Sequence, residues 1–263
     1  MRVVVAHSSD AGAVALVERW QAEGHAAGLL TVADLSAPGW VHDPERPALG
    51  SAVVGGRALR VSELSGVVTR LMTVVPLELP WIHEEDREYA AQEMHAFLLA
   101  WLTDLPCLVI NRPTPGCLAG PAWGPEEWVR RAFDAGMLGR EIVRGSRGIA
   151  SSADAPDAAP ARATVAVEVV RERAFIAGKA PSALDQPLAD VALALARGAG
   201  AELLHVELET GPDEAPRVVS AGPWLDVFPE RVACAVGDLF PVSPRAQNAA
   251  QPMARVTHWE NAP

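Results

Sequence analysis

The stretch LPCLVINRPTPGCLAGPAWGPEEW, Leu105–Trp128, is the part of the chain on which the expected fold depends. Its apolar run Cys107–Ile110 predicts a central, buried strand. The prolines and glycines that follow cannot continue a strand, so Asn111–Gly120 is expected to form a loop at the carboxyl end of that strand. Pro125 suits the first turn of a helix, where its missing N–H would have no partner in any case. The stretch therefore predicts a strand, a loop and a helix.

The chain before this stretch repeats the same order of elements. Apolar runs predict strands, and apolar residues at helical spacing predict helices between them. The Gly55-Gly56 pair predicts the turn of a β-hairpin over Ala52–Leu59. The other expected elements are strands at Met1–Ala6, Ala27–Val32 and Gly66–Met72 and a long helix at Glu84–Leu102. This order is typical of an open α/β half with a parallel sheet.

The chain after this stretch predicts a smaller α+β half. Its expected elements are a helix at Pro125–Gly136, a hairpin of Thr164–Val170 and Arg173–Ile176, a helix at Leu184–Ala196, strands at Leu203–Leu208 and Arg217–Ser220, and a helix at Leu225–Leu239. Between the halves, Gly145–Arg162 contains SSADAPDAAPA, which offers nothing to bury and is expected to be a flexible loop or linker. The domains are therefore expected at 1–144 and 164–240, joined by residues 145–163 and followed by a tail at 241–263.

Composition excludes several classes of function. The 263 residues carry a net charge of −11, which would repel a nucleic-acid backbone and an anionic membrane surface. The three cysteines have no metal-binding spacing, and no run of eighteen apolar residues occurs, so a reduced, cytoplasmic protein is expected. Lys179 is the only lysine, so an enzyme that needs lysines at phosphates would have to use arginines instead.

The order of these motifs resembles the ATP-grasp ligases, and among them the graspetide-type macrocyclases and ribosomal-protein glutamate ligases. The resemblance rests on GVVTRL at Gly66–Leu71, YAxxExxAFLxxWLxxL at Tyr89–Leu105, VINRP at Val109–Pro113 and AxxAGM at Ala132–Met137. It implies an α/β fold with a pre-ATP-grasp-like parallel-sheet half and a reduced ATP-grasp-like α+β half.

The resemblance also implies a chemistry, and this chain departs from it. Such ligases activate a carboxylate as an acyl phosphate, with lysines at the ATP phosphates and carboxylates on magnesium. Where relatives carry the first lysine, this chain has Gly124-Pro125-Glu126, and the room for the first ATP lobe is limited to Leu138–Ala163. Glu207 matches the first magnesium ligand, but Ser220 and Gly222 stand where a glutamate and an asparagine are expected. The site therefore looks degenerate.

Arg70, Asn111 and Arg112 are the candidate ligand-binding residues, because they end strands at the edge where an open α/β sheet binds its ligand. The alternative is that they are structural, with the arginines bonded to loop carbonyls or to acidic residues and Asn111 bonded to its own loop. The nearby acidic residues are Glu78, Glu84 and Asp86.

Several other positions have two interpretations each. Ser9 or Asp10 is expected to cap the helix that follows, although the loop His7-Ser8-Ser9-Asp10 could also hold an anion. Cys117 could be a nucleophile, but no histidine and aspartate pattern marks it as activated. His205 and Glu207 lie on one face of a strand, where Glu207 could bind a metal or the two could act as base and acid.

The expected function is that of a degenerate ATP-grasp protein that binds a peptide or protein partner as an accessory subunit in peptide or natural-product biosynthesis, without a cofactor. One alternative is a compact active carboxylate-amine ligase that holds Mg-ATP with Arg70, Arg112 and Arg140. Another is a different enzyme on the same scaffold. Relatives are often homodimers, and self-association is expected through apolar residues of the long helix: Met94, Phe97, Leu98, Leu99, Trp101 and Leu102.

Overall fold

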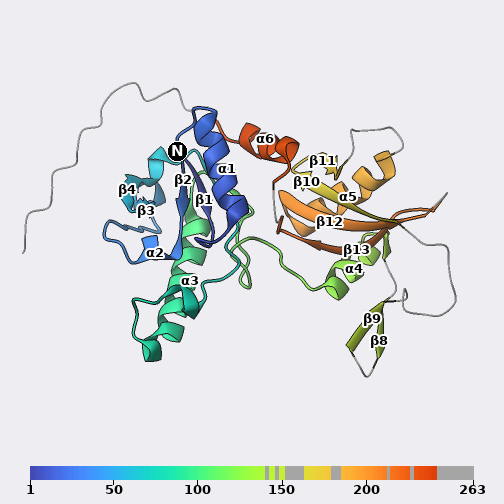
Figure 1. Cartoon of the computed structure of the whole chain (residues 1–263), viewed down its shortest axis with the longest axis horizontal. Coiled ribbons are helices and arrows are strands. Elements are labelled where there is room, and N and C mark those ends of the chain that lie inside the picture. Colours follow the sequence, from blue (N-terminus) through green and yellow to red (C-terminus); the bar gives the residue numbers. More distant parts are fainter. Residues whose placement is uncertain are drawn as a thin grey trace, which may run out of the picture.

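The computed structural model describes residues 1–139, 142–145, 148–151, 163–178, 185–211, 214–225 and 228–241. These residues build two large sheets that lie side by side, the first at the left of Figure 1 and the second at the right, and two small hairpins. Lys179, Arg140 and the expected tail beyond Pro241 lie outside the described residues.

The first sheet is parallel throughout, as the sequence predicts. Its strand order is β2-β1-β5-β6. The strands are β1 (Arg2–Val5), β2 (Ala27–Leu30), β5 (Gly66–Thr69) and β6 (Leu108–Ile110). The order places the loops after β1, β5 and β6 at one edge of the sheet, as expected for parallel strands.

Helices cover both faces of this sheet. Val4 packs on one face with helices α1 (Ala11–Ala22) and α6 (Glu230–Asp238). Val3 and Val5 point to the other face, where α3 (Arg87–Asp104) packs. Because neither face meets water, the strands read as continuous apolar runs rather than as an alternation.

The strand β6 corrects one prediction, because it lies at the edge of the sheet and not at its centre. The strand starts at Leu108, so Cys107 precedes it. Ile110 is nevertheless fully buried, since it packs in one cluster with Val170 and Leu203 from the second half of the chain. An apolar run does not distinguish a central strand from an edge strand that another part of the fold covers.

The second sheet has the order β11-β10-β12-β13-β7, antiparallel except for the pair β13–β7. Helices α4 (Pro125–Asp134) and α5 (Gln186–Ala199) cover one face of it, where Leu204, Val206 and Leu208 point. The strands are β7 (Leu138–Gly139), β10 (Ala163–Val170), β11 (Arg173–Ile176), β12 (Leu203–Thr210) and β13 (Arg217–Gly222).

The remaining elements are small. The predicted hairpin over Ala52–Leu59 is confirmed as β3 (Ser51–Val54) and β4 (Arg57–Arg60), and α2 (Val32–Leu35) is a single turn. A second hairpin, β8 (Ile142–Gly145) and β9 (Gly148–Ser151), reaches into the segment expected to be a linker, whose residues 152–162 are outside the described part.

One prediction about a helix needs correction. The last helix begins at Glu230 and not at Leu225, because Pro229 precedes it with ψ at 148°, outside the helical range. On α3, Leu98, Trp101 and Leu102 are in the core, and Met94, Phe97 and Leu99 are partly buried against it. Self-association through these residues stays a prediction. No helix among the described residues is long and apolar enough to cross a bilayer.

Candidate functional site

Arg70 follows β5 and is enclosed rather than open to a crevice, with 2% of its surface exposed. Its Nε and Nη2 donate to the carboxylate of Asp10 at 2.7 and 3.0 Å. The guanidinium carbon lies 4.8 Å from the Trp224 ring centre and 5.0 Å from that of Phe228. Arg70 thus joins the first sheet to the chain segment that precedes α6.

Of the two residues predicted as the cap of α1, Ser9 and Asp10, it is Asp10 that caps the helix. Its Oδ1 accepts a hydrogen bond of 2.9 Å from the Ala13 backbone N–H. The same carboxylate holds Arg70, so one side chain satisfies both a helix end and a buried cation. Glu78, named as a partner for the arginines, instead lies 2.6 Å from the Nδ1 atom of His7.

Asn111 is 1% exposed, and its carboxamide bonds to backbone on both sides. Nδ2 donates to the carbonyl oxygens of Ala119 and Leu203, and Oδ1 accepts from the N–H groups of Glu202 and Leu203. The bond to Ala119 is the predicted bond to its own loop. The bonds to Glu202 and Leu203 tie this loop to the start of β12.

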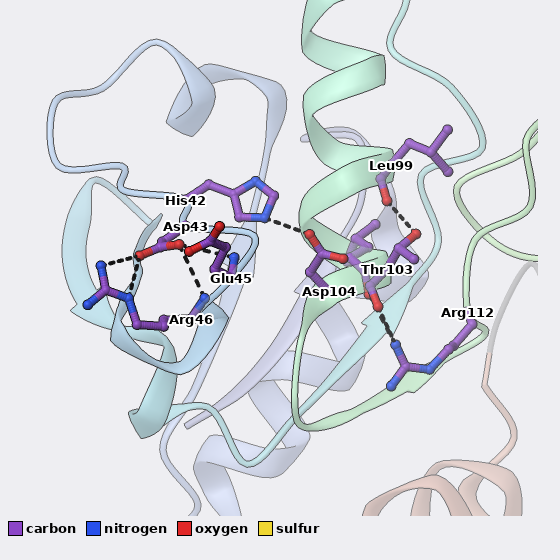
Figure 2. A network of polar contacts seen from close by, with 9 residues as sticks. His42, Asp43, Glu45, Arg46, Leu99, Thr103, Asp104 and Arg112 are labelled. Atoms are coloured by element: carbon purple, nitrogen blue, oxygen red, sulfur yellow. Dashed lines mark hydrogen bonds and ion pairs between the residues drawn. The ribbon is translucent and has the colours of Figure 1, made fainter.

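Arg112 lies at the carboxyl end of α3, as Figure 2 shows. Nη1 donates to the carbonyl of Thr103 at 2.9 Å, and longer contacts of 3.4 to 3.5 Å reach the carbonyls of Leu102, Leu105 and Cys107. A cation at the end of a helix satisfies carbonyls that the helix leaves unpaired. Arg112 therefore bonds to backbone carbonyls, as in the structural alternative, although two of them belong to the end of α3 and not to a loop.

Arg70, Asn111 and Arg112 thus bond to three different elements, the start of α1, the start of β12 and the end of α3. The structure does not gather them around one space. Asn111 is satisfied by backbone groups, Arg112 is exposed, and Arg70 Nη1 is buried without a hydrogen-bond partner in the described part of the chain. A ligand-binding role for the three residues stays a prediction.

The polar face of the second sheet is the side opposite α4 and α5. On it Glu207 lies opposite Ser220, and His205 lies opposite Gly222, in the β12–β13 pairing. Ser220 Oγ donates to Glu207 Oε2 at 2.6 Å. The three positions named from the resemblance are therefore neighbours, as a metal site would require. One carboxylate, one hydroxyl and one glycine do not make such a site for magnesium.

Glu168 belongs to the same face, and the sequence analysis missed it. It pairs with His205 across β10 and β12, and its Oε1 lies 2.9 Å from His205 Nδ1. Glu168 is 6% exposed, and its Oε2 has no hydrogen-bond partner among the described residues. A lone acidic residue within the valine run of β10 was the signal that could have revealed it.

Metal and thiol chemistry find no further support in the described part of the chain. It contains no group of three or more histidine, cysteine, aspartate or glutamate side chains placed to hold a metal ion. Burial raises the pKa of the Cys117 thiol and also that of Cys107. A raised pKa keeps a thiol protonated at neutral pH, which is the opposite of what a nucleophile needs.

No protein-family model and no curated protein matches the chain. Several solved structures match its fold. The macrocyclase MdnC from Microcystis aeruginosa MRC, bound with its precursor peptide MdnA, aligns with a TM-score of 0.64 and 15% identity over 92% of this chain and 100% of that one. The ATP-grasp ligase PsnB, complexed with precursor peptide PsnA2 and AMPPNP, aligns with a TM-score of 0.64 and 14% identity over 90% and 96%.

The fold is that of the ATP-grasp ligases. A third similar structure, the macrocyclase MdnB from the same Microcystis strain, aligns with a TM-score of 0.60 and 12% identity over 90% of this chain and 97% of that one. The two halves expected from the resemblance are thus the two sheets described above. At these identities the likeness concerns the fold.

Proposed function

We propose that this chain is an ATP-grasp-fold protein that binds a peptide in a peptide-modification pathway and no longer forms an acyl phosphate. Support for a peptide partner comes from the similar structures, since MdnC and PsnB were each solved with a precursor peptide. The single observation that carries the loss of chemistry is the cross-strand group of Glu207, Ser220 and Gly222. At the positions named from the resemblance it has one carboxylate instead of two or three, and the other carboxylate described on this face, Glu168, is bonded to His205.

Other features support the same proposal. The helix α4 begins Gly124-Pro125-Glu126, with no lysine where a phosphate contact is expected. The ATP lobe expected between α4 and β10 is represented, among the described residues, by β7 and the hairpin β8–β9. A phosphoryl group in transfer needs cations that compensate its charge.

The alternative of an active ligase that uses arginines has less support. Arg70 is committed to Asp10, and Arg112 to the carbonyls at the end of α3. Moving either to a phosphate would leave a buried carboxylate or a helix end without its partner. Arg140 lies outside the described residues.

The proposal makes a thermal test possible. If Mg-ATP bound with a Kd of about 0.1 mM, about 5 mM nucleotide would stabilise the fold by about 2 kcal/mol and raise the unfolding midpoint by about 5 °C. We expect no such rise. A rise of that size that disappears in Glu207→Ala would show a working nucleotide site and overturn the loss of chemistry.

Peptide binding is tested separately by selection from a displayed peptide library on the immobilised chain. Enrichment of peptides with a shared motif supports the proposal. A library that yields no shared motif over several rounds would contradict the peptide-binding half of it, whatever the nucleotide experiment shows.

A further inference from the structure

A pocket of about 240 Å³ lies between α4 and α5, on the side of the second sheet away from Glu207. Trp123, Arg131 and Met137 line it from the α4 side, and Leu195 and Ala199 from α5. It is therefore separate from the place where the ATP-grasp chemistry would occur.

The pocket exists because α5 presents small residues towards α4. Ala194 and Gly198, which are four residues apart and so on one side of the helix, line it together with Ala199. A Cβ atom added at Gly198 would meet no other heavy atom within 4 Å. Gly198 is thus an exposed lining residue of the pocket, and a larger side chain at this position would meet no clash at its Cβ atom.

One wall of the pocket is a cation fixed on an aromatic ring. The guanidinium carbon of Arg131 lies 3.6 Å from the centre of the Trp123 ring, and that ring packs at 4.6 Å against the fully buried Trp128. Arg131 Nε donates to Glu127 at 2.8 Å. A guanidinium held by both contacts is oriented before any ligand arrives.

The terminal nitrogens of Arg131 are its available donors. Within the described part of the chain, neither Nη1 nor Nη2 of Arg131 has a hydrogen-bond partner. The carboxylate at the pocket rim, Asp134, is already paired with Nη1 of Arg130 at 2.6 Å. The pocket is therefore lined both by apolar side chains, Leu195 and Met137, and by the guanidinium of Arg131.

We propose that this pocket binds the C-terminal residue of a peptide, with its free carboxylate on Arg131 and an apolar side chain such as leucine on Leu195 and Ala199. A volume of about 240 Å³ is below the roughly 300–1,000 Å³ of small-molecule sites, so it suits one amino-acid residue rather than a nucleotide.

A chain end also fits the geometry better than an internal acidic residue. In a C-terminal residue the carboxylate and the side chain leave the same Cα atom, so both reach one small pocket. In an extended internal segment, neighbouring side chains point to opposite faces, and in a helix the nearest pair lies about 5–6 Å apart. The proposed function enters this inference only through the choice of a peptide as the ligand.

The test uses the full chain and a synthetic hexapeptide that ends in leucine, as the free acid and as the C-terminal amide, in isothermal titration calorimetry. The free acid should bind about tenfold or more tightly than the amide, the difference expected for a lost charge-assisted hydrogen bond. Arg131→Gln should remove that preference, and Gly198→Leu should remove binding of both forms. Arg57→Gln, on the exposed strand β4 in the other half of the fold, should behave like the wild-type chain.

Three outcomes would overturn the site: no binding of the free acid at about 10 mM, equal affinity for acid and amide, or unchanged binding by a Gly198→Leu variant. Folding of each variant is checked by its unfolding midpoint, and Arg131→Gln decides the question alone if Gly198→Leu does not fold. A nucleotide-induced thermal shift would contradict the proposed loss of chemistry without touching this site.

Discussion

The carboxamide of Asn111 bonds to both the N–H and the carbonyl oxygen of Leu203, 92 residues further along the chain, each at 2.8 Å. It does with a side chain what a neighbouring strand would do with its backbone. The edge strand β6 is thereby joined to the start of β12, and the two halves of the fold share a hydrogen-bonded contact that excludes water.

Replacing Asn111 by alanine should lower the free energy of unfolding by about 3–5 kcal/mol, because the N–H and carbonyl of Leu203 would stay buried without partners. Urea denaturation of the variant measures this loss. Gln92→Ala on the exposed face of α3 is the control and should change stability by less than about 0.5 kcal/mol. If the Asn111 variant were as stable as this control, the contact would not hold the two halves together.

Arg112→Ala should lower stability by about 1.5–3 kcal/mol, the cost of losing a charged hydrogen bond to the end of α3. Arg112→Lys should recover part of the loss, since it keeps a cation near the carbonyls. The denaturation midpoints of the wild-type chain, Arg112→Ala and Arg112→Lys measure these losses. A variant with unchanged stability but weaker peptide binding would restore the ligand-binding role predicted from the sequence.

The pair of Arg70 and Asp10 is best tested by a double-mutant cycle. Asp10→Ser keeps a cap for α1 but leaves Arg70 buried without its counter-charge, so we expect a loss of about 3–5 kcal/mol. Arg70→Met should cost a similar amount by isolating the carboxylate. The double variant should be more stable than the sum of the two losses predicts; strict additivity in chemical denaturation would show that the two charges do not interact.

Acid stability should depend on Glu127. Its pKa is lowered from 4.5 to about 2, first by hydrogen bonds from Arg130 and then by those from Arg131. A pKa that is lower in the folded state means that this contribution to stability is present above pH 4.5 and is lost as the pH falls towards 2. The difference in midpoint between the wild-type chain and Glu127→Gln should therefore shrink over this window. A difference that is constant with pH would rule out the linkage.

The sequence predicted local structure well and long-range partners poorly. Periodicity located the parallel strands and the hairpin at Gly55-Gly56, because these depend on neighbouring residues. It could not show that Asn111 bonds to Leu203 or that Arg70 bonds to Asp10, since both partners are set by the tertiary arrangement. Only the resemblance to ATP-grasp ligases, and not the periodicity, predicted that Glu207 and Ser220 belong to one site.

The degenerate metal site can be tested by reversing it. In the double variant Ser220→Glu, Gly222→Asn, a second carboxylate would face Glu207, and like charges on paired strands should lower the unfolding midpoint by the equivalent of up to about 1 kcal/mol without divalent ions. A Cβ at Gly222 would be no closer than 4.0 Å to its nearest neighbour, so the asparagine fits.

Magnesium at millimolar concentration should then raise the midpoint of the double variant, because two carboxylates and an amide oxygen supply the ligands that the ion prefers. The control is Ser220→Gln, Gly222→Asn, which has the same size and lacks the added charge, and its midpoint should not respond to magnesium. If the double variant also failed to respond, the polar face would not retain the geometry of a metal site, and Glu207 would be no relic of one.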